Sequence, residues 1–267
     1  MNIYLRLTRE FNEGRLRAII CSGQAVVLHR LAIMSKDGDW ILREDDETLR
    51  HVLSVLEAHG ARYRYGAPLE ARWMRGGWSS HFEFREDGLR VRADFFTRPP
   101  RISQADLTRI WNEQRARDIP FLDPPELAEM KKTNRERDYA VIGELARLMN
   151  RPELELLYSR SARDLIRLSR EHPGVSERLT EARPLLAFIS QGRERLEQEL
   201  DAERRRLIRL NEARLKAYGD AAADWYALWP SVAVETAGLS LLEAHEIVVS
   251  RAEGVLPTTI EPSKGRA

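Results

Sequence analysis

Two aspartates, Asp37 and Asp39, stand two residues apart in a segment that otherwise has the composition of a buried strand, SGQAVVLHRLAIMSKDGDWIL. On a strand, side chains at positions i and i+2 project from the same face, so the two carboxylates are expected side by side. Like charges that close repel, and one pKa would rise unless a cation lies between them. A hard divalent ion such as Mg²⁺ prefers carboxylate oxygens. The pair therefore predicts a metal site.

A third carboxylate, Asp94, belongs to the segment LRVRADFFT, in which apolar residues alternate with Arg90, Arg92 and Asp94. This alternation predicts a strand with one polar face. If that strand lies beside the one that carries Asp37 and Asp39, three carboxylates share a face. Such a set can hold two metal ions at the spacing used for phosphoryl and nucleotidyl transfer.

The tripeptide Ser22-Gly23-Gln24 lies between a predicted strand over 16–22 and a predicted helix over 25–32. Glycine lets the backbone approach a ligand closely, and a helix N-terminus offers unpaired N–H groups to an anion. A triphosphate would suit both these amides and the metal ions.

In order and spacing, Gly23, Asp37, Asp39 and Asp94 resemble the motifs of the nucleotidyltransferase superfamily, which has the polymerase-β-like fold. The first motif looks most like that of bacterial minimal and toxin-type members. The helical segment KKTNRERDYAVIGELARL is similar to a helix that often follows in those proteins. The resemblance covers about residues 16–150.

This sequence departs from the family pattern at four positions. Gln24 replaces the usual Ser or Gly, Gly38 replaces an apolar residue, Ser35 replaces Thr, and Ile33 replaces Arg. The first departure bears on the triphosphate contact, and the last two bear on the turn before the aspartate strand. An inactive relative that keeps the fold is therefore an open alternative.

The resemblance implies a role for each candidate residue. Asp37, Asp39 and Asp94 would be the catalytic and metal-binding carboxylates, with Mg²⁺ or Mn²⁺ bound, and Asp94 would help to deprotonate the acceptor hydroxyl. The residues that would bind the phosphates of an NTP are Ser22, Gly23 and Gln24, with Lys131, Lys132, Arg135 or Arg137 from the helical part.

Three functions remain open from the sequence. The first is transfer of NMP from an NTP to a hydroxyl of a protein, a tRNA or a small molecule. The second is a binding protein that keeps this fold without activity, such as a toxin–antitoxin partner that uses its helical half. The third is hydrolysis of phosphoesters with the same metals.

The composition sets limits on these functions. The chain has 267 residues, of which 43% are hydrophobic and 32% charged, and a net charge of +1, so no global basic field indicates nucleic acid. The single cysteine, Cys21, excludes a disulfide within the chain and a cysteine zinc site. The N-terminus is too polar for a signal peptide, and no apolar run approaches the roughly 18 residues of a membrane span. We expect a cytoplasmic protein without a membrane contact.

The predicted fold class is α+β, with a small mixed-sheet nucleotidyltransferase-like domain over 1–100, a helical domain over 101–257 and a loose tail over 258–267. Alternating apolar runs predict strands over 39–44, 79–87 and 88–96, and amphipathic patterns predict helices over 45–60, 153–172 and 193–219. The last of these mixes Arg and Glu, which fits a solvated helix or a surface for RNA or a partner protein.

Overall fold

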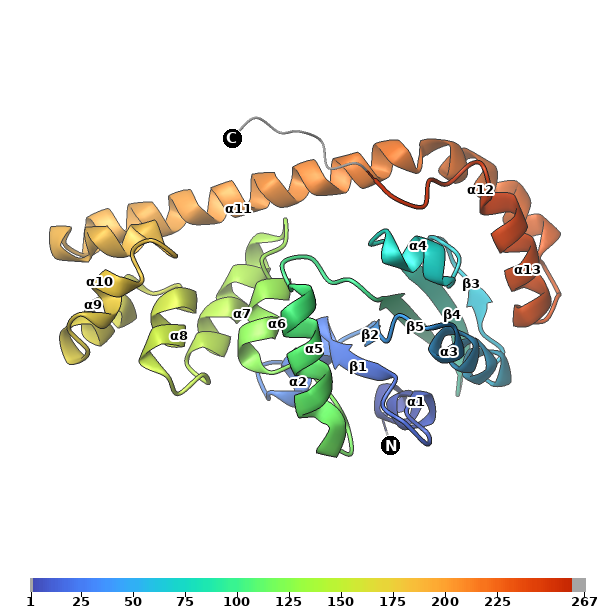
Figure 1. Ribbon diagram of the computed structural model, residues 1–267, viewed down its shortest axis with the longest axis horizontal. Coiled ribbons are helices and arrows are strands. Elements are labelled where there is room, and N and C mark those ends of the chain that lie inside the picture. Colours follow the sequence, from blue (N-terminus) through green and yellow to red (C-terminus); the bar gives the residue numbers. More distant parts are fainter. Residues whose placement is uncertain (1, 261–267) are drawn as a thin grey trace. The chain divides into compact units, whose positions relative to one another are not determined.

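A mixed five-stranded sheet in the order β1-β2-β5-β4-β3 frames the N-terminal part of the computed structural model, which describes residues 2–260 (Figure 1). Strand β2 runs parallel to β5, and the other neighbours are antiparallel. The strands are β1 (Ala18–Cys21), β2 (Gly38–Leu42), β3 (Arg62–Tyr63), β4 (Ser80–Glu86) and β5 (Leu89–Phe96). The sheet and the helices that follow it confirm the predicted α+β class.

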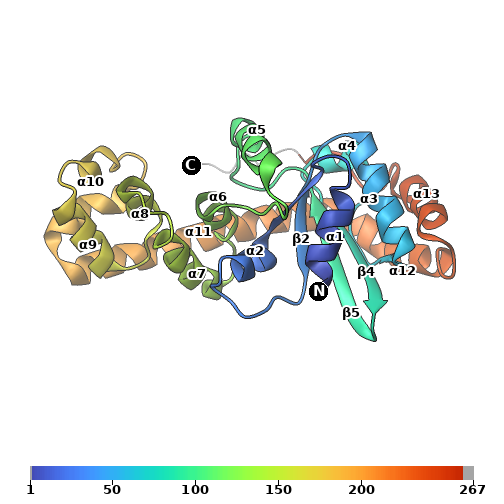
Figure 2. The same ribbon diagram turned by 90° about the horizontal axis from the view of Figure 1, so that it is seen from below.

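Strands β4 and β5 form a hairpin and run side by side in Figure 2. Its turn holds Asp87 and Gly88 at φ values of 49° and 77°. Both residues therefore adopt the left-handed backbone that a two-residue hairpin turn requires, which Gly and Asp tolerate better than most residues. The turn thus joins the two strands predicted over 79–87 and 88–96, which pair antiparallel.

One face of the sheet is apolar and packs against helix α1 (Ile3–Phe11). The ring of Phe11 meets the rings of Trp40 and Phe95 edge-on, at centroid distances of 5.4 Å and 5.6 Å. Gly38 allows Trp40 and Tyr4 to pack closely against the backbone on this face. A Cβ at this position would lie only 2.4 Å from Trp40 and 2.5 Å from Tyr4. The absence of a side chain between the two aspartates is thus explained by close packing behind them.

The start of helix α3 is determined by a capping residue. Helix α3 begins after Asp45, whose carboxylate accepts a hydrogen bond of 2.8 Å from Thr48 N and so caps the helix. The α-helices are α1 (Ile3–Phe11), α2 (Ser22–Leu28), α3 (Asp46–Ala58), α4 (Ala71–Arg75), α5 (Gln104–Glu113), α6 (Pro124–Met130), α7 (Glu136–Ala146), α8 (Pro152–Tyr158), α9 (Ala162–Glu171), α10 (Val175–Arg178), α11 (Arg193–Ala221), α12 (Ala223–Glu235) and α13 (Leu241–Ala252). Two 3₁₀ segments cover Gln114–Ala116 and Pro184–Gln191.

The single helix predicted over 153–172 is two helices, α8 and α9. Ser159 has the extended backbone angle ψ 138° and ends α8, and the hydroxyl of Ser161 accepts from Asp164 N at 3.2 Å and starts α9. Serine side chains compete with the helical hydrogen bonds in this way. The apolar periodicity alone did not indicate the break.

The chain divides into two compact units, residues 2–122 with 216–260 and residues 123–215. The C-terminal segment joins the sheet unit, because the indole nitrogens of Trp73 and Trp78 donate to the carbonyls of Leu256 at 3.0 Å and Pro257 at 2.8 Å. This division differs from the boundaries expected at 100 and 257. Of the tail expected over 258–267, residues 261–267 lie outside the described part.

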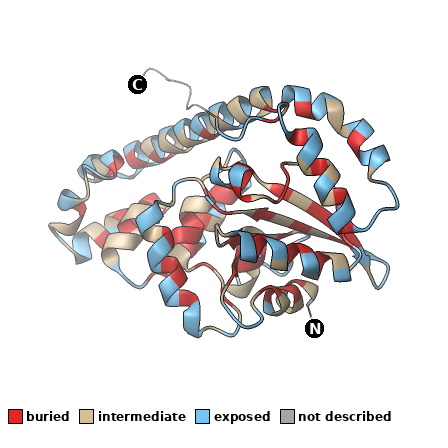
Figure 3. Ribbon diagram, turned by 45° about the vertical axis from the view of Figure 1, so that its right-hand side comes forward, coloured by how far each residue is buried: buried red, intermediate tan, exposed pale blue. Residues whose placement is uncertain are grey.

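The second unit is helical and has a core of its own, formed by leucines of α8, α9, the second 3₁₀ segment and α11. In Figure 3 the buried residues fill the strands of the sheet, whereas α11 carries few of them, among them Leu196 and Leu200. Among the described residues no helix is both long and apolar enough to cross a membrane.

Candidate active site

A row of side chains runs across the polar face of the sheet, one from each strand or its end. Cys21 of β1 is the Cα partner of Asp39 of β2, Asp39 is the partner of Asp94 of β5, and Asp94 is the partner of His81 of β4. Beyond β3, the backbone N–H of Arg64 donates to the carbonyl of His81 at 2.9 Å. Since partners in register share a face, Asp39, Asp94, His81 and Arg64 form one continuous row.

A second row lies beside the first on the same face, two residues away on each strand. Glu83 of β4 is the Cα partner of Arg92 of β5 and of Arg62 of β3. Asp37 precedes β2 and lies next to Arg92, with Oδ1 3.4 Å from Arg92 Nη1. The second row therefore alternates in charge along Asp37, Arg92, Glu83 and Arg62.

The Asp94 side chain is more enclosed than that of Asp37, with 18% of it exposed against 41%. Its Oδ1 accepts hydrogen bonds from His81 Nδ1 at 2.8 Å and Arg64 Nη2 at 3.2 Å. An ionised carboxylate between a guanidinium and an imidazole is electrostatically favoured. The negative charge at Asp94 is thus compensated by protein groups.

The pKa of Tyr4 is affected by the negative charge of Asp37 and Asp39, at the β2 side of the two rows. Its hydroxyl donates to the carbonyl of Lys36 at 2.7 Å. Burial, followed by the charges of Asp37 and Asp39, raises the pKa of Tyr4. The two aspartates therefore create a negative potential at the start of β2, as two carboxylates on one face of a strand should.

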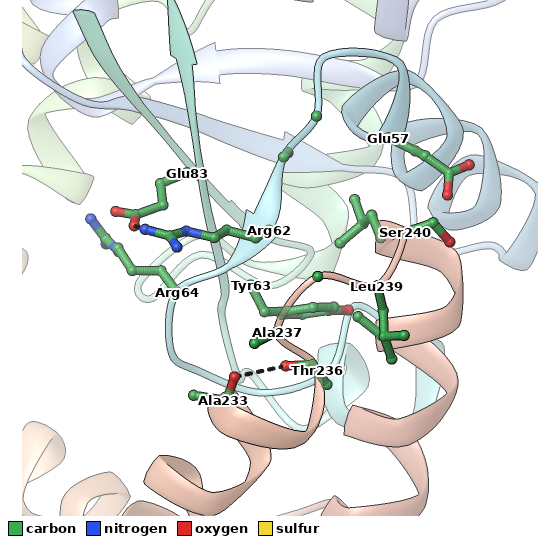
Figure 4. Close-up of a pocket in the computed structure, with 15 residues that line it drawn as sticks. Glu57, Arg62, Tyr63, Arg64, Glu83, Ala233, Thr236, Ala237, Leu239 and Ser240 are labelled. Carbon is green, nitrogen blue, oxygen red and sulfur yellow. Dashed lines mark hydrogen bonds and ion pairs between the residues drawn. The ribbon is translucent and has the colours of Figure 1, made fainter.

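Glu83 pairs with two arginines, Arg62 and Arg90. Its Oε1 accepts from Arg62 Nη2 at 2.8 Å, and its Oε2 accepts from Arg90 Nε at 2.7 Å. Burial opposes its ionisation, but the two arginines outweigh burial and lower the pKa of Glu83. Figure 4 shows Arg62 and Arg64 extending toward Glu83, whereas Tyr63 points the opposite way.

A pocket of ≈ 550 Å³ adjoins this end of the polar face (Figure 4). It lies between β3 and the end of α12, and Arg62, Arg64 and Glu83 contribute to its wall. Tyr63 separates it from the interior, with its hydroxyl donating to His245 Nδ1 at 2.7 Å and accepting from Leu69 N at 3.0 Å. The cationic end of the face thus opens into a cavity of ligand size.

Ser22, Gly23 and Gln24 begin α2 directly after Cys21, at the β1 end of the first row. A Cβ on Gly23 would lie 2.3 Å from Ser35 Oγ, so glycine permits close packing against the turn before Asp37. The buried side chain of Gln24 donates to the carbonyl of Ser35 at 3.0 Å. The Gln24 side chain therefore holds the turn before Asp37. Because this side chain is already bonded, the predicted contact with phosphate would have to come from backbone N–H groups.

Lys131 and Arg137 belong to the second compact unit, whereas every residue of the two rows belongs to the first. Lys131 is buried, and its Nζ lies 3.4 Å from Asp138 Oδ1. The other oxygen of Asp138, Oδ2, accepts a hydrogen bond from Thr133 Oγ1 at 2.6 Å. Arg135 pairs with the same carboxylate at 2.9 Å. Arg137 is exposed.

The donor chemistry of the aspartates fits a hard divalent cation, and the register brings the backbones of Asp39 and Asp94 within one strand spacing, about 4.8 Å. The side chains of Asp37 and Asp94, however, turn to Arg92, Arg64 and His81. Over residues 2–260 no group of three or more His, Cys, Asp or Glu side chains is arranged to hold a metal ion. Metal binding would therefore require these two carboxylates to leave their partners.

Sequence reasoning did not assign the partners of the aspartates. His81 and Glu83 stand in the alternating segment SSHFEFRED, so their shared face could be predicted, but their pairing with β5 through Asp94 and Arg92 depended on the hairpin register. Arg64 follows a strand of only two residues, which leaves almost no pattern.

No protein-family model and no curated protein matches the chain. Two solved structures are similar to it, both at 12% identity. One is a candidate nucleotidyltransferase from H. pylori, with a TM-score of 0.40 over 78% of this chain and 93% of that one. The other is JHP933 from Helicobacter pylori, with a TM-score of 0.39 over 79% of this chain and 92% of that one. Likeness at this level transfers no function to the chain.

Proposed function

We propose that this protein is a metal-dependent nucleotidyltransferase, which moves NMP from an NTP to a hydroxyl acceptor. One observation carries the proposal: Asp39 has Cys21 as its Cα partner on one side and Asp94 on the other. The strand end that leads into the glycine turn, the second aspartate of the Asp-x-Asp pair and the later aspartate therefore lie on three neighbouring strands, which supports the proposal.

In this proposal each part of the row has a separate task. Asp37, Asp39 and Asp94 would hold Mg²⁺ or Mn²⁺, which when bound supplies charge neutralisation for the phosphates and for the leaving pyrophosphate. The backbone N–H groups of Ser22 and Gly23 would face the β- and γ-phosphates. The acceptor would be a protein, a tRNA or a small molecule.

A second candidate function is a binding protein that keeps the fold without activity, for example a toxin–antitoxin partner that binds through its helices. The ion pairs of Asp37 with Arg92 and of Asp94 with Arg64 favour it, because the carboxylates then already have cationic partners. The replacement of a small residue by Gln24 favours it as well.

The test uses four NTPs, each labelled at the α-phosphate, with Mn²⁺ or Mg²⁺ and with or without total tRNA and cell protein. We expect a labelled macromolecule and pyrophosphate with the wild type and with Asp87→Asn, a hairpin-turn control. Asp39→Asn should lower the rate at least about 100-fold. Release of orthophosphate instead of pyrophosphate would indicate a hydrolase, and an unchanged rate in Asp39→Asn would contradict the proposal.

A further inference from the structure

A pocket of ≈ 380 Å³ lies within the second compact unit, to which every residue that lines it belongs. Helices α6, α7, α8 and α11 contribute to its wall (Figure 1). Its cationic side chains are Lys132, Arg160, Arg183 and Arg206, and its anionic side chains are Glu129 and Glu203. Four positive charges against two negative ones leave the wall with an excess of two positive charges. Nothing in the nucleotidyltransferase proposal uses this pocket.

Two of the arginines share a single glutamate, Glu203 of α11. Arg183 Nε and Nη2 donate to its two carboxylate oxygens at 3.1 Å and 3.0 Å, and Arg160 Nη1 donates to the oxygen that also accepts from Arg183 Nη2. Arg183 Nη1 donates to the carbonyl of Leu156 at 2.7 Å, and Arg160 Nη2 donates to that of Leu200 at 3.2 Å. A carbonyl satisfies a donor but carries no net charge. One of the two guanidinium charges therefore has no counter-ion among the described residues.

Burial makes this excess charge costly. The side chains of Arg160 and Arg183 are largely buried, so water does little to solvate them. Burial, together with the charge of Arg183, lowers the pKa of Arg160 against the attraction of Glu203. A buried charge without a partner is unfavourable, and an anion beside it would restore the balance. The wall of the pocket therefore favours a negatively charged ligand.

The second excess charge is that of Arg206. Lys132 already pairs with Glu129 at 2.5 Å, and the Tyr158 hydroxyl donates to the same carboxylate oxygen at 2.8 Å. Arg206 is exposed and has no ion-pair partner in the part of the chain that the structure describes. It follows Glu203 by three residues on α11, so the two side chains share a face of that helix. Arg206 is thus the lining cation that is available to bind an anion.

Part of the remaining wall is apolar and determines what else the ligand can carry. Ile142 is buried, and Leu157 and Leu207 are half-buried beside the cations. A volume of ≈ 380 Å³ lies at the small end of the range of ligand sites. The pocket therefore suits a ligand that combines a compact anion with a small apolar group.

We propose that this pocket binds a small phosphomonoester whose organic group is apolar. A phosphomonoester carries about two negative charges at neutral pH, which matches the excess on the wall. Its oxygens would accept hydrogen bonds from Arg206, Lys132 and Arg160, since guanidinium groups suit the geometry of phosphate. The organic group would contact Ile142 and Leu207. This site is independent of the proposed nucleotidyl transfer, whose residues belong to the other unit.

The experiment titrates the full-length protein with phenyl phosphate and with phenyl sulfate in a calorimeter. EDTA is present throughout, so no divalent ion can bring either anion to the aspartates of the sheet. The two anions have nearly the same shape, but the sulfate ester carries only one negative charge. We expect phenyl phosphate to bind with one site per chain and at least about 10-fold more tightly than phenyl sulfate, because it matches both excess charges. Phenol, which has no anionic group, should not bind measurably.

Variants of the lining cations locate the site. Arg206→Ala and Lys132→Gln should each weaken the binding of phenyl phosphate by about 10-fold or more, the effect of losing one charge-assisted hydrogen bond. The matched control is Arg205→Ala, which removes an exposed cation next to Arg206 that does not line the pocket and should leave the affinity unchanged. Circular dichroism and melting curves confirm that the variants fold.

Four results would overturn the site. Absence of binding by phenyl phosphate excludes it directly, and equal affinities for the two esters show that the charge excess does not select the ligand. Unchanged affinity in both Arg206→Ala and Lys132→Gln places the ligand elsewhere. An equal loss in Arg205→Ala reduces the effect to the general positive charge of α11. Binding of total tRNA that phenyl phosphate does not compete with would leave the proposal standing only if phenyl phosphate binds as expected by itself.

Discussion

Asp39 and Asp94 are Cα partners on neighbouring parallel strands, so two carboxylates leave the same face of the sheet one strand apart. Their mutual repulsion, together with that from Asp37, is reduced by Arg92, Arg64 and His81 and would be reduced further by a divalent cation. In the proposed function, a bound divalent cation would take the place of these protein partners.

This exchange predicts a stabilisation by metal. Mn²⁺ at about 100 times its dissociation constant should stabilise the native protein by about 2.7 kcal/mol and raise its melting temperature by a few degrees. The shift should persist in Asp87→Asn and fall by more than half in Asp39→Asn. Equal shifts in both variants, measured by differential scanning fluorimetry, would show that the ion binds elsewhere.

The sequence predicted those parts of the fold that depend on local patterns. The alternation in LRVRADFFT predicted a polar face with Arg92 and Asp94, and Val91, Ala93 and Phe95 are buried on the other side. These features are decided by residues within a few positions of one another.

The sequence could not predict contacts between distant segments. Trp73 and Trp78 donate hydrogen bonds to the carbonyls of Leu256 and Pro257, which lie about 180 residues further along the chain. The sequence around the tryptophans contains no pattern that identifies these partners, and neither does the sequence around the carbonyls. The same limit applies to Arg64 and Asp94, which meet only because the strand order places β4 between β3 and β5. The unit boundaries and the partners of the carboxylates therefore required the structure.

A buried charge cluster should dominate the stability of the second unit. Arg160 and Arg183 both pair with Glu203, and the three side chains are only 13%, 3% and 14% exposed. Burial opposes ionisation of Glu203, but the two arginines lower its pKa. Glu203→Gln leaves two cations buried without their counter-ion, so we expect a loss of about 3–5 kcal/mol in the free energy of unfolding.

The matched control for that variant is Glu197→Gln on the same helix, which breaks an exposed pair with Arg193 and should cost less than about 1 kcal/mol. All six tryptophans lie in the first unit, so fluorescence follows that unit and far-UV circular dichroism follows the helices of both. Glu203→Gln should shift the dichroism transition in urea. Similar midpoints for Glu203→Gln and Glu197→Gln would contradict the prediction.

His245 should make the first unit less stable in mild acid. Burial lowers its pKa from 6.5 to about 4, so the folded state keeps it neutral while the unfolded state takes up a proton. Its contribution to stability is complete above pH 6.5 and is lost as the pH falls toward 4. A pKa difference of about 2.5 units at about 1.4 kcal/mol each gives a loss of about 3.5 kcal/mol once the pH lies below 4.

Denaturant unfolding at pH 7.5 and pH 4.5 measures this loss, with His245→Gln as the comparison. The glutamine does not titrate, and its amide can still accept from the Tyr63 hydroxyl that now bonds to His245 Nδ1. We expect the fluorescence transition of the variant to depend less on pH than that of the wild type. The role of His245 is refuted if both proteins lose the same stability between the two pH values.

Gly38 and Gly219 should respond in opposite ways to the same added methyl group. At Gly38 a Cβ would meet the rings of Trp40 and Tyr4 at 2.4 Å and 2.5 Å, so Gly38→Ala must displace the aromatic core behind the aspartates and should cost about 1–3 kcal/mol. At Gly219, inside α11, an added Cβ would meet no atom within 4 Å apart from its chain neighbours and the nearby backbone of its own helix, and Gly219→Ala should stabilise the helix by roughly 0.5–1 kcal/mol. Melting temperatures should therefore fall for the first variant and rise for the second. A rise for both would mean that Trp40 and Tyr4 can move aside, and that the glycine between Asp37 and Asp39 is not needed for packing.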